Sequence, residues 1–233
     1  MKVLRAVLAA GCVATLTGAP YSGGTDRAAN ARQQSARVPT PDPVRGLYVN
    51  RWAARGQAMH QLIDLAIRTE VNALVIDVKD DRGLVLYKSG VPLAREIGAD
   101  TLQPLTTARI RGILDTMRAH DIYPIARIVV AKDPLLAERK REWAILRKSD
   151  HKPWLDKNGN PWLDPHHPEI WTYAADLAAE AVAVGFSEVQ FDYVRFPDEK
   201  RLIREATFPL AQIQIYQSVW LRDRRRHQNW RLR

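Results

Sequence analysis

Two aspartates stand inside otherwise apolar segments of this sequence. Asp77 lies in the run 73–78 (ALVIDV) and Asp192 in the run 187–194 (SEVQFDYV). An ionised carboxylate is costly to bury unless a cation, a hydrogen-bond donor or water compensates it. Cleavage of a glycosidic bond uses two carboxyl groups, one that protonates the leaving oxygen and one that attacks the sugar or activates water. We predict Asp192 as the nucleophile or base and Asp77 as the second catalytic candidate.

The alternation of side chains along a strand decides where these carboxylates point. In the first run Asp77 shares a face with Val75, and in the second Asp192 shares a face with Gln190. The opposite face of both runs is apolar and suited to contact helices: Leu74, Ile76, Val78, Val189 and Phe191. We therefore expect Asp77 and Asp192 to face one shared cavity on the side of the sheet away from the helices.

The two runs are expected to form the second and fourth strands, which are not neighbours, so the two acids could lie too far apart to act as a direct pair. Lys79 and Arg195 are available as compensating cations. The structural alternative is that both acids only pair with these bases or cap loops. Asp77 and Asp80 could also bind sugar hydroxyls, or hold Lys79 in place.

Polar and aromatic residues near the expected strand ends are the candidates for substrate binding, because the loops after the strands of a barrel carry its active site. Trp162 is the preferred partner for stacking on a sugar ring, with Trp52 and Trp154 as further aromatic candidates, whereas Trp171 lies on an apolar helical face and is expected to pack. The predicted binding residues are Asn50, Lys79, Asp80, Arg127, Trp162, Asp164, Tyr193 and Arg195.

No metal or cofactor is predicted. His166 and His167 follow Asp164, but the two histidines are adjacent and precede Pro168, so a role at the start of a helix is the simpler explanation. A Gly-x-Gly-x-x-Gly turn is missing after the first expected strand, which removes the usual sign of dinucleotide binding. Cys12 is the single cysteine, so no intramolecular disulfide can form.

Apolar periodicity predicts strands that alternate with helices. Strands are expected at 46–49, 73–78, 122–130 and 187–194. A helix is expected after Gly56, a second one around Ile110 to Met117, a third one from Pro134 to about Leu146, and a fourth one from Pro168 to Gly185. The pattern indicates an α/β fold with a parallel sheet, either an open doubly wound sheet or a barrel. Four β-α steps amount to about the N-terminal half of an eight-stranded (β/α) TIM-type barrel.

The ends of the chain differ from this core in composition. Lys2 and Arg5 precede a short apolar run, as in a signal peptide or a lipoprotein leader (1–17), and Cys12 could carry a lipid. Residues 18–43 are predicted to be a flexible linker, 44–199 the partial barrel, and 200–233 an atypical basic tail. Much of the formal charge of +9 is in this tail. We expect an extracytoplasmic location, and the tail could be either a truncated reading or a binder of an anionic polymer.

Several motifs in this order resemble a bacterial family of glycoside hydrolase domains that is distantly related to the alpha-amylase-type barrels. The segments are 44–49 (VRGLYV), 73–80 (ALVIDVKD), 91–94 (VPLA), 162–165 (WLDP) and 190–197 (QFDYVRFP). The resemblance covers about residues 44–199. It implies a TIM-type barrel outside the cytoplasm, a polysaccharide or cell-envelope glycan as substrate, and the nucleophile position for Asp192. Residues after Glu199 depart from the family, which would supply its second catalytic carboxylate from later strands.

Three hypotheses follow. The first is a glycoside hydrolase, cut short after its fourth strand, that acts through Asp192. The second is a glycan-binding partial barrel without catalysis. The third is binding of nucleic acid or an anionic polymer by the basic tail, with affinity that falls steeply with salt. We expect a glycan as the partner, no nucleic acid, and a monomeric protein.

Overall fold

A computed structural model describes residues 38–208 of the chain. The predicted leader with Cys12, most of the predicted linker, and the arginine-rich residues 221–233 lie outside the described residues. Within 38–208, no helix is long and apolar enough to cross a membrane.

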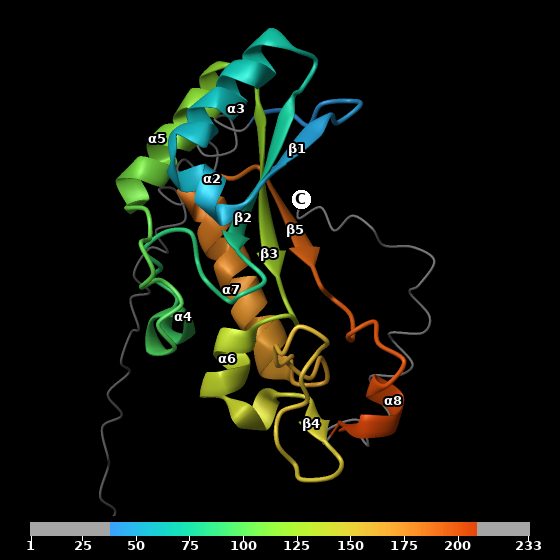
Figure 1. Cartoon of the computed structure of the whole chain (residues 1–233). Coiled ribbons are helices and arrows are strands. Elements are labelled where there is room, and N and C mark those ends of the chain that lie inside the picture. The colour runs from blue at the N-terminus through green and yellow to red at the C-terminus, as the bar shows by residue number, and fades with distance from the viewer. Residues whose placement is uncertain (1–37, 209–233) are drawn as a thin grey trace, which may run out of the picture. The chain divides into compact units, whose positions relative to one another are not determined.

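Four parallel strands form the central sheet in the order β1, β2, β3, β5 (Figure 1). The strand bounds are Gly46–Val49 for β1, Ala73–Lys79 for β2, Tyr123–Val129 for β3 and Glu188–Asp192 for β5. All four lie close to the predicted runs, which confirms the expected parallel sheet. The second and fourth of these strands, β2 and β5, are separated by β3, as the sequence indicated.

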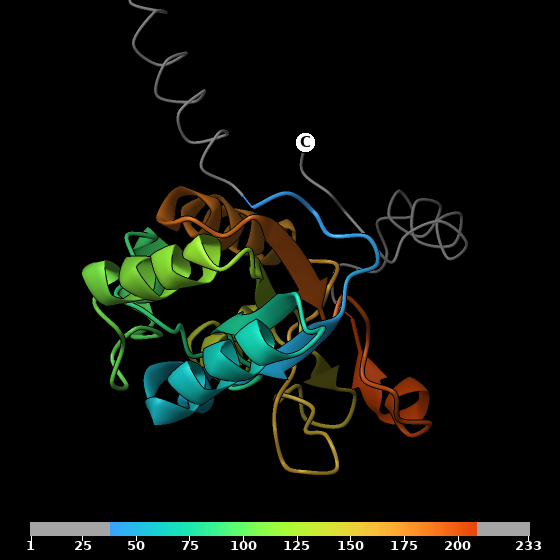
Figure 2. The same cartoon turned by 90° about the horizontal axis from the view of Figure 1, so that it is seen from above.

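Each connection between neighbouring strands contains a helix. α2 (Arg51–Arg55) and α3 (Gln57–Arg68) join β1 to β2, α5 (Thr107–Ala119) joins β2 to β3, and α7 (Pro168–Val184) joins β3 to β5. Seen from above, α3, α5 and α7 lie on the same side of the sheet (Figure 2). Helices on a single face fit a barrel wall and not a doubly wound sheet, which carries helices on both faces.

The main core lies between the sheet and these helices. Leu74, Ile76 and Val78 of β2 are fully buried and belong to the same cluster as Ile110 and Leu114 of α5. This places the apolar alternate residues toward the helices, as predicted, and turns the other face of the sheet away from them. Burying such side chains contributes about 1.5–3 kcal/mol each.

The start of the domain is earlier than the sequence indicated. Val38 is buried in a small cluster with Ala73 and Tyr123, the first residues of β2 and β3, and the Thr40 hydroxyl donates to the Tyr123 hydroxyl at 3.1 Å. Residues 38–43 were assigned to the flexible linker because they lack an apolar period. One buried valine is too weak a signal to detect in a run rich in proline.

Two long insertions follow the carboxyl ends of β2 and β3. The first contains α4 (Pro92–Glu96), and the second contains α6 (Pro134–Arg139), the 3-10 helix η1 (Arg141–Trp143) and β4 (Leu146–Arg147). The helix expected from Pro134 to about Leu146 is therefore shorter. Asp133 caps α6 by accepting from Leu136 N at 2.8 Å. The buried Ile145 does not continue the helix, because its backbone pairs with Trp154 and Trp162.

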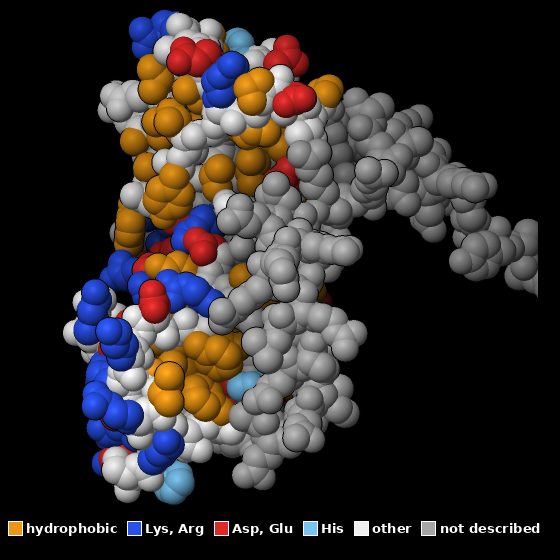
Figure 3. Space-filling view, turned by 90° about the vertical axis from the view of Figure 1, so that its right-hand side faces the viewer, with side chains coloured by type: hydrophobic (Ala, Val, Ile, Leu, Met, Phe, Trp, Pro, Cys, Tyr) orange, Lys and Arg blue, Asp and Glu red, His pale blue; other side chains and the backbone are white. Residues whose placement is uncertain are grey.

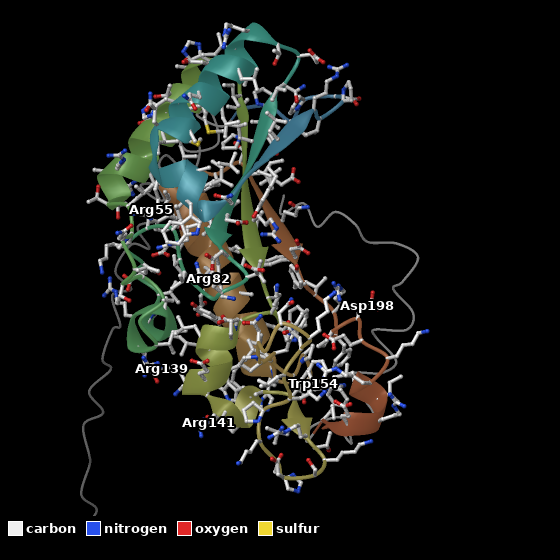
Figure 4. All side chains as sticks on the ribbon, in the orientation of Figure 1. Arg55, Arg82, Arg139, Arg141, Trp154 and Asp198 are labelled. Carbon is white, nitrogen blue, oxygen red and sulfur yellow. The ribbon has the colours of Figure 1, made fainter. Side chains whose placement is uncertain are left out.

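The chain after β5 also folds onto the second insertion. α8 (Leu202–Glu205) is followed by β6 (Ala206–Thr207), which pairs antiparallel with β4. Leu202 and Ala206 are buried in one cluster with Trp154, which lies on the loop that faces α8 (Figure 4). The first residues of the predicted basic tail are thus part of the fold, and residues 209–233 lie outside the described residues.

Candidate active site

One polar side chain from each of the four strands takes part in a continuous chain of hydrogen bonds. The Tyr48 hydroxyl (β1) donates to Asp77 Oδ2 (β2) at 2.5 Å, and Arg127 Nη1 (β3) donates to Asp77 Oδ1 at 2.5 Å. Arg127 also donates to Asp192 Oδ2 (β5) through Nη2 at 2.6 Å and Nε at 2.9 Å. Acidic and basic side chains meet in the middle of the face that is turned away from the helices (Figure 3).

Strand register explains this arrangement. Asp77 is paired directly with Arg127, which is paired with Gln190, and Asp192 lies two residues further along β5. Residues two apart on a strand share a face. Asp77, Arg127 and Asp192 are therefore on one face, and the long Arg127 side chain spans from its neighbour Asp77 to the strand end at Asp192. These contacts place Asp77 and Asp192 on the same face of the sheet, as predicted.

The two carboxylates differ in exposure. The Asp77 side chain is 3% exposed and that of Asp192 is 44% exposed, with the Arg127 side chain between them at 13%. Burial raises the pKa of Asp77, against the lowering effect of the hydrogen bonds from Tyr48 and Arg127. Burial and the neighbouring Asp77 raise the pKa of Tyr48, so its hydroxyl stays protonated. Of these two carboxylates, Asp192 is the one exposed to solvent.

Arg127 is the cation of this site. Burial lowers the pKa of Arg127, but the hydrogen bonds and charges of Asp77 and Asp192 raise it by more. The net shift of the pKa is upward, and the guanidinium stays charged. Its N–H donors and its charge serve both carboxylates at once. The sequence had suggested Lys79 and Arg195 for this compensation. Arg127 was predicted only as a substrate-binding residue.

The orientation of Asp192 is set from a second direction by Tyr193. Tyr193 has φ 52°, in the left-handed region, and its backbone N donates to Asp192 Oδ1 at 2.6 Å. A non-glycine residue in this region costs about 1–3 kcal/mol and is frequent at functional sites. With Arg127 on Oδ2 and one backbone donor on Oδ1, the carboxylate is held at both oxygens, and Oδ1 has the fewer contacts.

Lys79 does not lie where a substrate could contact it, which corrects the prediction. It is 2% exposed, and its ammonium binds Asp133 Oδ2 at 2.7 Å and the Val129 carbonyl at 2.6 Å. The register of β2 and β3 shifts between Asp77 and Lys79, so the simple alternation that puts both residues on one face fails there.

Three further predicted binding residues serve local structure. Asp80 is 5% exposed and accepts from Arg82 N and Leu84 N, which closes the turn after β2. Asn50 caps α2 by accepting from Ala53 N at 2.9 Å. Asp164 is fully buried and accepts from His166 N at 3.1 Å and contacts His166 Nδ1 at 2.7 Å. Within residues 38–208, no group of three His, Cys, Asp or Glu side chains could hold a metal ion.

Trp162, the preferred stacking residue, is buried. It is 4% exposed, its Nε1 donates to Asp156 Oδ2 at 3.1 Å, and its ring packs edge-on to Tyr193 at 5.5 Å. Trp154 is fully buried as well, whereas Trp52 is 45% exposed. A buried indole cannot offer a face to a sugar, so Trp162 supports the position of Tyr193 instead.

Two cations lie close to the Tyr193 ring. Lys132 Nζ is 5.2 Å and Arg195 Cζ 5.3 Å from its centroid, and Lys132 pairs with Asp81 at 2.6 Å. Arg195 therefore stacks on aromatic rings rather than compensating Asp192. Sequence reasoning missed Asp81 and Lys132. Their position just after β2 and β3 was the available signal, since strand ends carry the active sites of barrels.

The chain is similar to a known protein family and to solved structures. Residues 46–218 match the model of a family described as "Putative glycosyl hydrolase domain". The structure of a hypothetical protein from Ruminiclostridium thermocellum is 35% identical with a TM-score of 0.65, over 76% of this chain and 90% of that one. No functionally curated protein matches the chain.

Two glycoside hydrolases of family 20 share the fold. Flavobacterium johnsoniae chitobiase is 17% identical with a TM-score of 0.54. The exo-β-N-acetylglucosaminidase of Vibrio harveyi, solved with N-acetylglucosamine, is 16% identical with a TM-score of 0.52. Each match covers 76% of this chain, which spans only 27% and 30% of those two chains. The chain belongs to the glycosyl hydrolase domain family that residues 46–218 match, and its described part has the fold of one half of a (β/α) TIM-type barrel.

Proposed function

We propose that this chain is a glycoside hydrolase in which Asp192 acts as the nucleophile or base on a polysaccharide or cell-envelope glycan. The observation that carries the proposal is the state of Asp192: a half-exposed carboxylate at the carboxyl end of β5, held by Arg127 and by Tyr193 N. Membership of the glycosyl hydrolase domain family supports this chemistry.

The contacts of Asp192 suit an attack on an anomeric carbon. Arg127 donates to Oδ2 twice, which leaves Oδ1 as the atom that forms the bond to the sugar or removes a proton from water. The bond between the anomeric carbon and the leaving oxygen breaks in that step, and a separate acid returns a proton to the leaving oxygen. A carboxylate held at both oxygens needs little reorganisation during the reaction.

Asp77 has a different role in this proposal. Its side chain is 3% exposed and is bonded to Tyr48 and Arg127. A carboxyl group in this position orients Arg127 and does not reach a sugar. We therefore infer that Asp77 is a positioning residue, and that Asp81, which is half-exposed and paired with Lys132, binds sugar hydroxyls.

The N-terminal residues bear on the cellular location of the protein. The apolar run after Lys2 and Arg5 supports export, and Cys12 is a candidate for lipid attachment. We propose a monomeric extracytoplasmic enzyme. The Vibrio harveyi enzyme that shares the fold is named for N-acetylglucosamine, but at 16% identity it supports the fold and does not identify the sugar.

Covalent labelling tests the assignment of Asp192. The protein is incubated with 2-deoxy-2-fluoroglycosyl fluorides of several sugars, whose good leaving group removes the need for a proton donor, and the adduct is located by peptide mass spectrometry. A nucleophile gives an adduct on the peptide that contains Asp192. Asp192→Asn gives none, whereas the control Asp198→Asn, an exposed acid on the loop after β5 (Figure 4), labels normally.

Hydrolysis of aryl glycosides separates the two roles of Asp192. Turnover without an adduct that is lost in Asp192→Asn assigns Asp192 as the base. Turnover that Asp192→Asn retains removes Asp192 from the mechanism. Retention of a glycan by both proteins without any turnover would instead support the non-catalytic binding module.

A further inference from the structure

Trp52 is an exposed indole surrounded by three arginines. It lies on α2, directly after the carboxyl end of β1, and is 45% exposed. The guanidinium carbons of Arg51 and Arg55 are each 5.2 Å from the ring centroid, and that of Arg82 is 5.9 Å away. We call these four residues the Trp52 cluster.

The charges of this cluster are not compensated by contact. Among the described residues, none of Arg51, Arg55 and Arg82 forms a salt bridge. Asp80 acts on Arg51 through space, whereas Arg55 and Arg82 lower the pKa of Arg51 by charge repulsion, after the larger effect of burial. The indole ring attracts each guanidinium, but the three like charges repel one another, and a bound anion relieves that repulsion.

Within residues 38–208, two buried donors of the cluster also lack hydrogen-bond partners. Arg51 is 1% exposed; its Nε donates to the Val85 carbonyl at 3.2 Å and its Nη2 donates to the Leu102 carbonyl, but Nη1 has no partner among the described residues. Arg55 uses Nη2 on Gln103 and leaves Nε without a partner. A buried donor without a partner costs about 1–3 kcal/mol.

The cluster is connected to the candidate active site. Arg82 is next to Asp81, which pairs with Lys132, and Lys132 lies over the ring of Tyr193, the residue after Asp192. Trp52, Asp81 and Asp192 all follow the carboxyl ends of strands of one parallel sheet, β1, β2 and β5. Trp52 and Asp192 therefore belong to the same edge of the sheet.

We propose that the Trp52 cluster is a binding subsite for an acidic glycan, in which the indole edge contacts a sugar ring and Arg55 and Arg82 bind a carboxylate or phosphate group on the chain. Guanidinium groups bind both anions through paired N–H donors. Arg51 is buried and contributes a fixed positive charge to the subsite. This inference deepens the proposed function and relies on it only for the ligand being a glycan.

A binding experiment on Asp192→Asn protein tests the subsite without consuming the ligand. Calorimetry compares four probes: oligogalacturonate, its carboxyl-reduced neutral form, a glycerol phosphate polymer, and single-stranded DNA of equal charge. We expect oligogalacturonate or the phosphate polymer to bind at least tenfold more tightly than the neutral form, with affinity that falls with salt. The stronger of the two identifies the anion.

Variants locate the binding. Adding Arg55→Gln and Arg82→Gln is expected to remove most of the preference for the acidic probe, and Trp52→Ala to weaken acidic and neutral probes alike. The matched control is Arg139→Gln with Arg141→Gln, two exposed arginines on α6 and η1 (Figure 4), which leaves binding unchanged. Thermal unfolding confirms that each variant is folded.

Three results overturn the subsite: equal affinity for acidic and neutral glycan, full binding by the Arg55 and Arg82 double variant, or DNA bound as tightly as the acidic glycans. These outcomes are separate from failure of the proposed function, because labelling of Asp192 does not involve the Trp52 cluster. A protein that is labelled at Asp192 but has no preference for acidic glycans keeps the hydrolase proposal and loses this one.

Discussion

Arg127 binds Asp192 through two nitrogens of one guanidinium, both directed at Oδ2, while its third nitrogen holds Asp77. Arg127 is therefore shared between a buried and a half-exposed carboxylate on two strands that do not touch. Asp192 therefore depends on a residue of a different strand for its position.

Replacing Arg127 leaves Asp77 buried without its cation. We expect Arg127→Gln to lower the free energy of unfolding by about 3 kcal/mol and to abolish labelling of Asp192, because breaking a buried ion pair on one side is strongly destabilising. Adding Asp77→Asn removes the unpaired charge and restores part of the stability but no labelling. Urea unfolding measures both proteins, and a double variant no more stable than Arg127→Gln contradicts the prediction.

Asp77 makes stability depend on pH in a defined direction. Burial raises its pKa above the ordinary value of 3.8. A carboxyl group whose pKa is raised by folding stabilises the protein below its ordinary pKa, and this contribution is lost as pH rises through the folded value. Compared with Asp77→Asn, the natural chain should lose unfolding free energy as pH rises from 3 upward. Urea titrations of both proteins across this range test the trend, and a difference that does not vary with pH argues against it.

The left-handed backbone at Tyr193 predicts an unusual order of stability. Glycine adopts φ 52° without strain and alanine does not. Tyr193→Gly should therefore be more stable than Tyr193→Ala by about 1 kcal/mol, although glycine normally destabilises. The same pair at Val194 is the control, since no positive φ occurs there. An alanine variant at least as stable as the glycine variant contradicts the assignment of strain.

Lys79 distinguishes a structural from a substrate-binding role. Lys79→Met leaves the fully buried Asp133 without its cation and should cost about 3 kcal/mol of stability. Turnover per folded molecule should be retained. Lys88→Met is the control, because Lys88 is 58% exposed and its contact with Asp100 is 3.6 Å long. A stable Lys79→Met protein with a raised KM would return Lys79 to the binding site.

The sequence predicted the sheet, its helices and the direction of Asp77 and Asp192 because alternation and helical spacing are local patterns. It did not predict that Arg127 bridges the two acids, since this depends on the order β2, β3, β5. The shift in register after Asp77 reversed the expected role of Lys79. Trp162 was misassigned because its burial depends on Asp156 and Tyr193, which the loop conformation brings to it.

Val38 packs beneath the first residues of β2 and β3, at the opposite end of the sheet from Asp192. The described part of the chain consequently enters the domain at the amino-terminal ends of the strands. Asp192 lies at their carboxyl ends, a full strand length away.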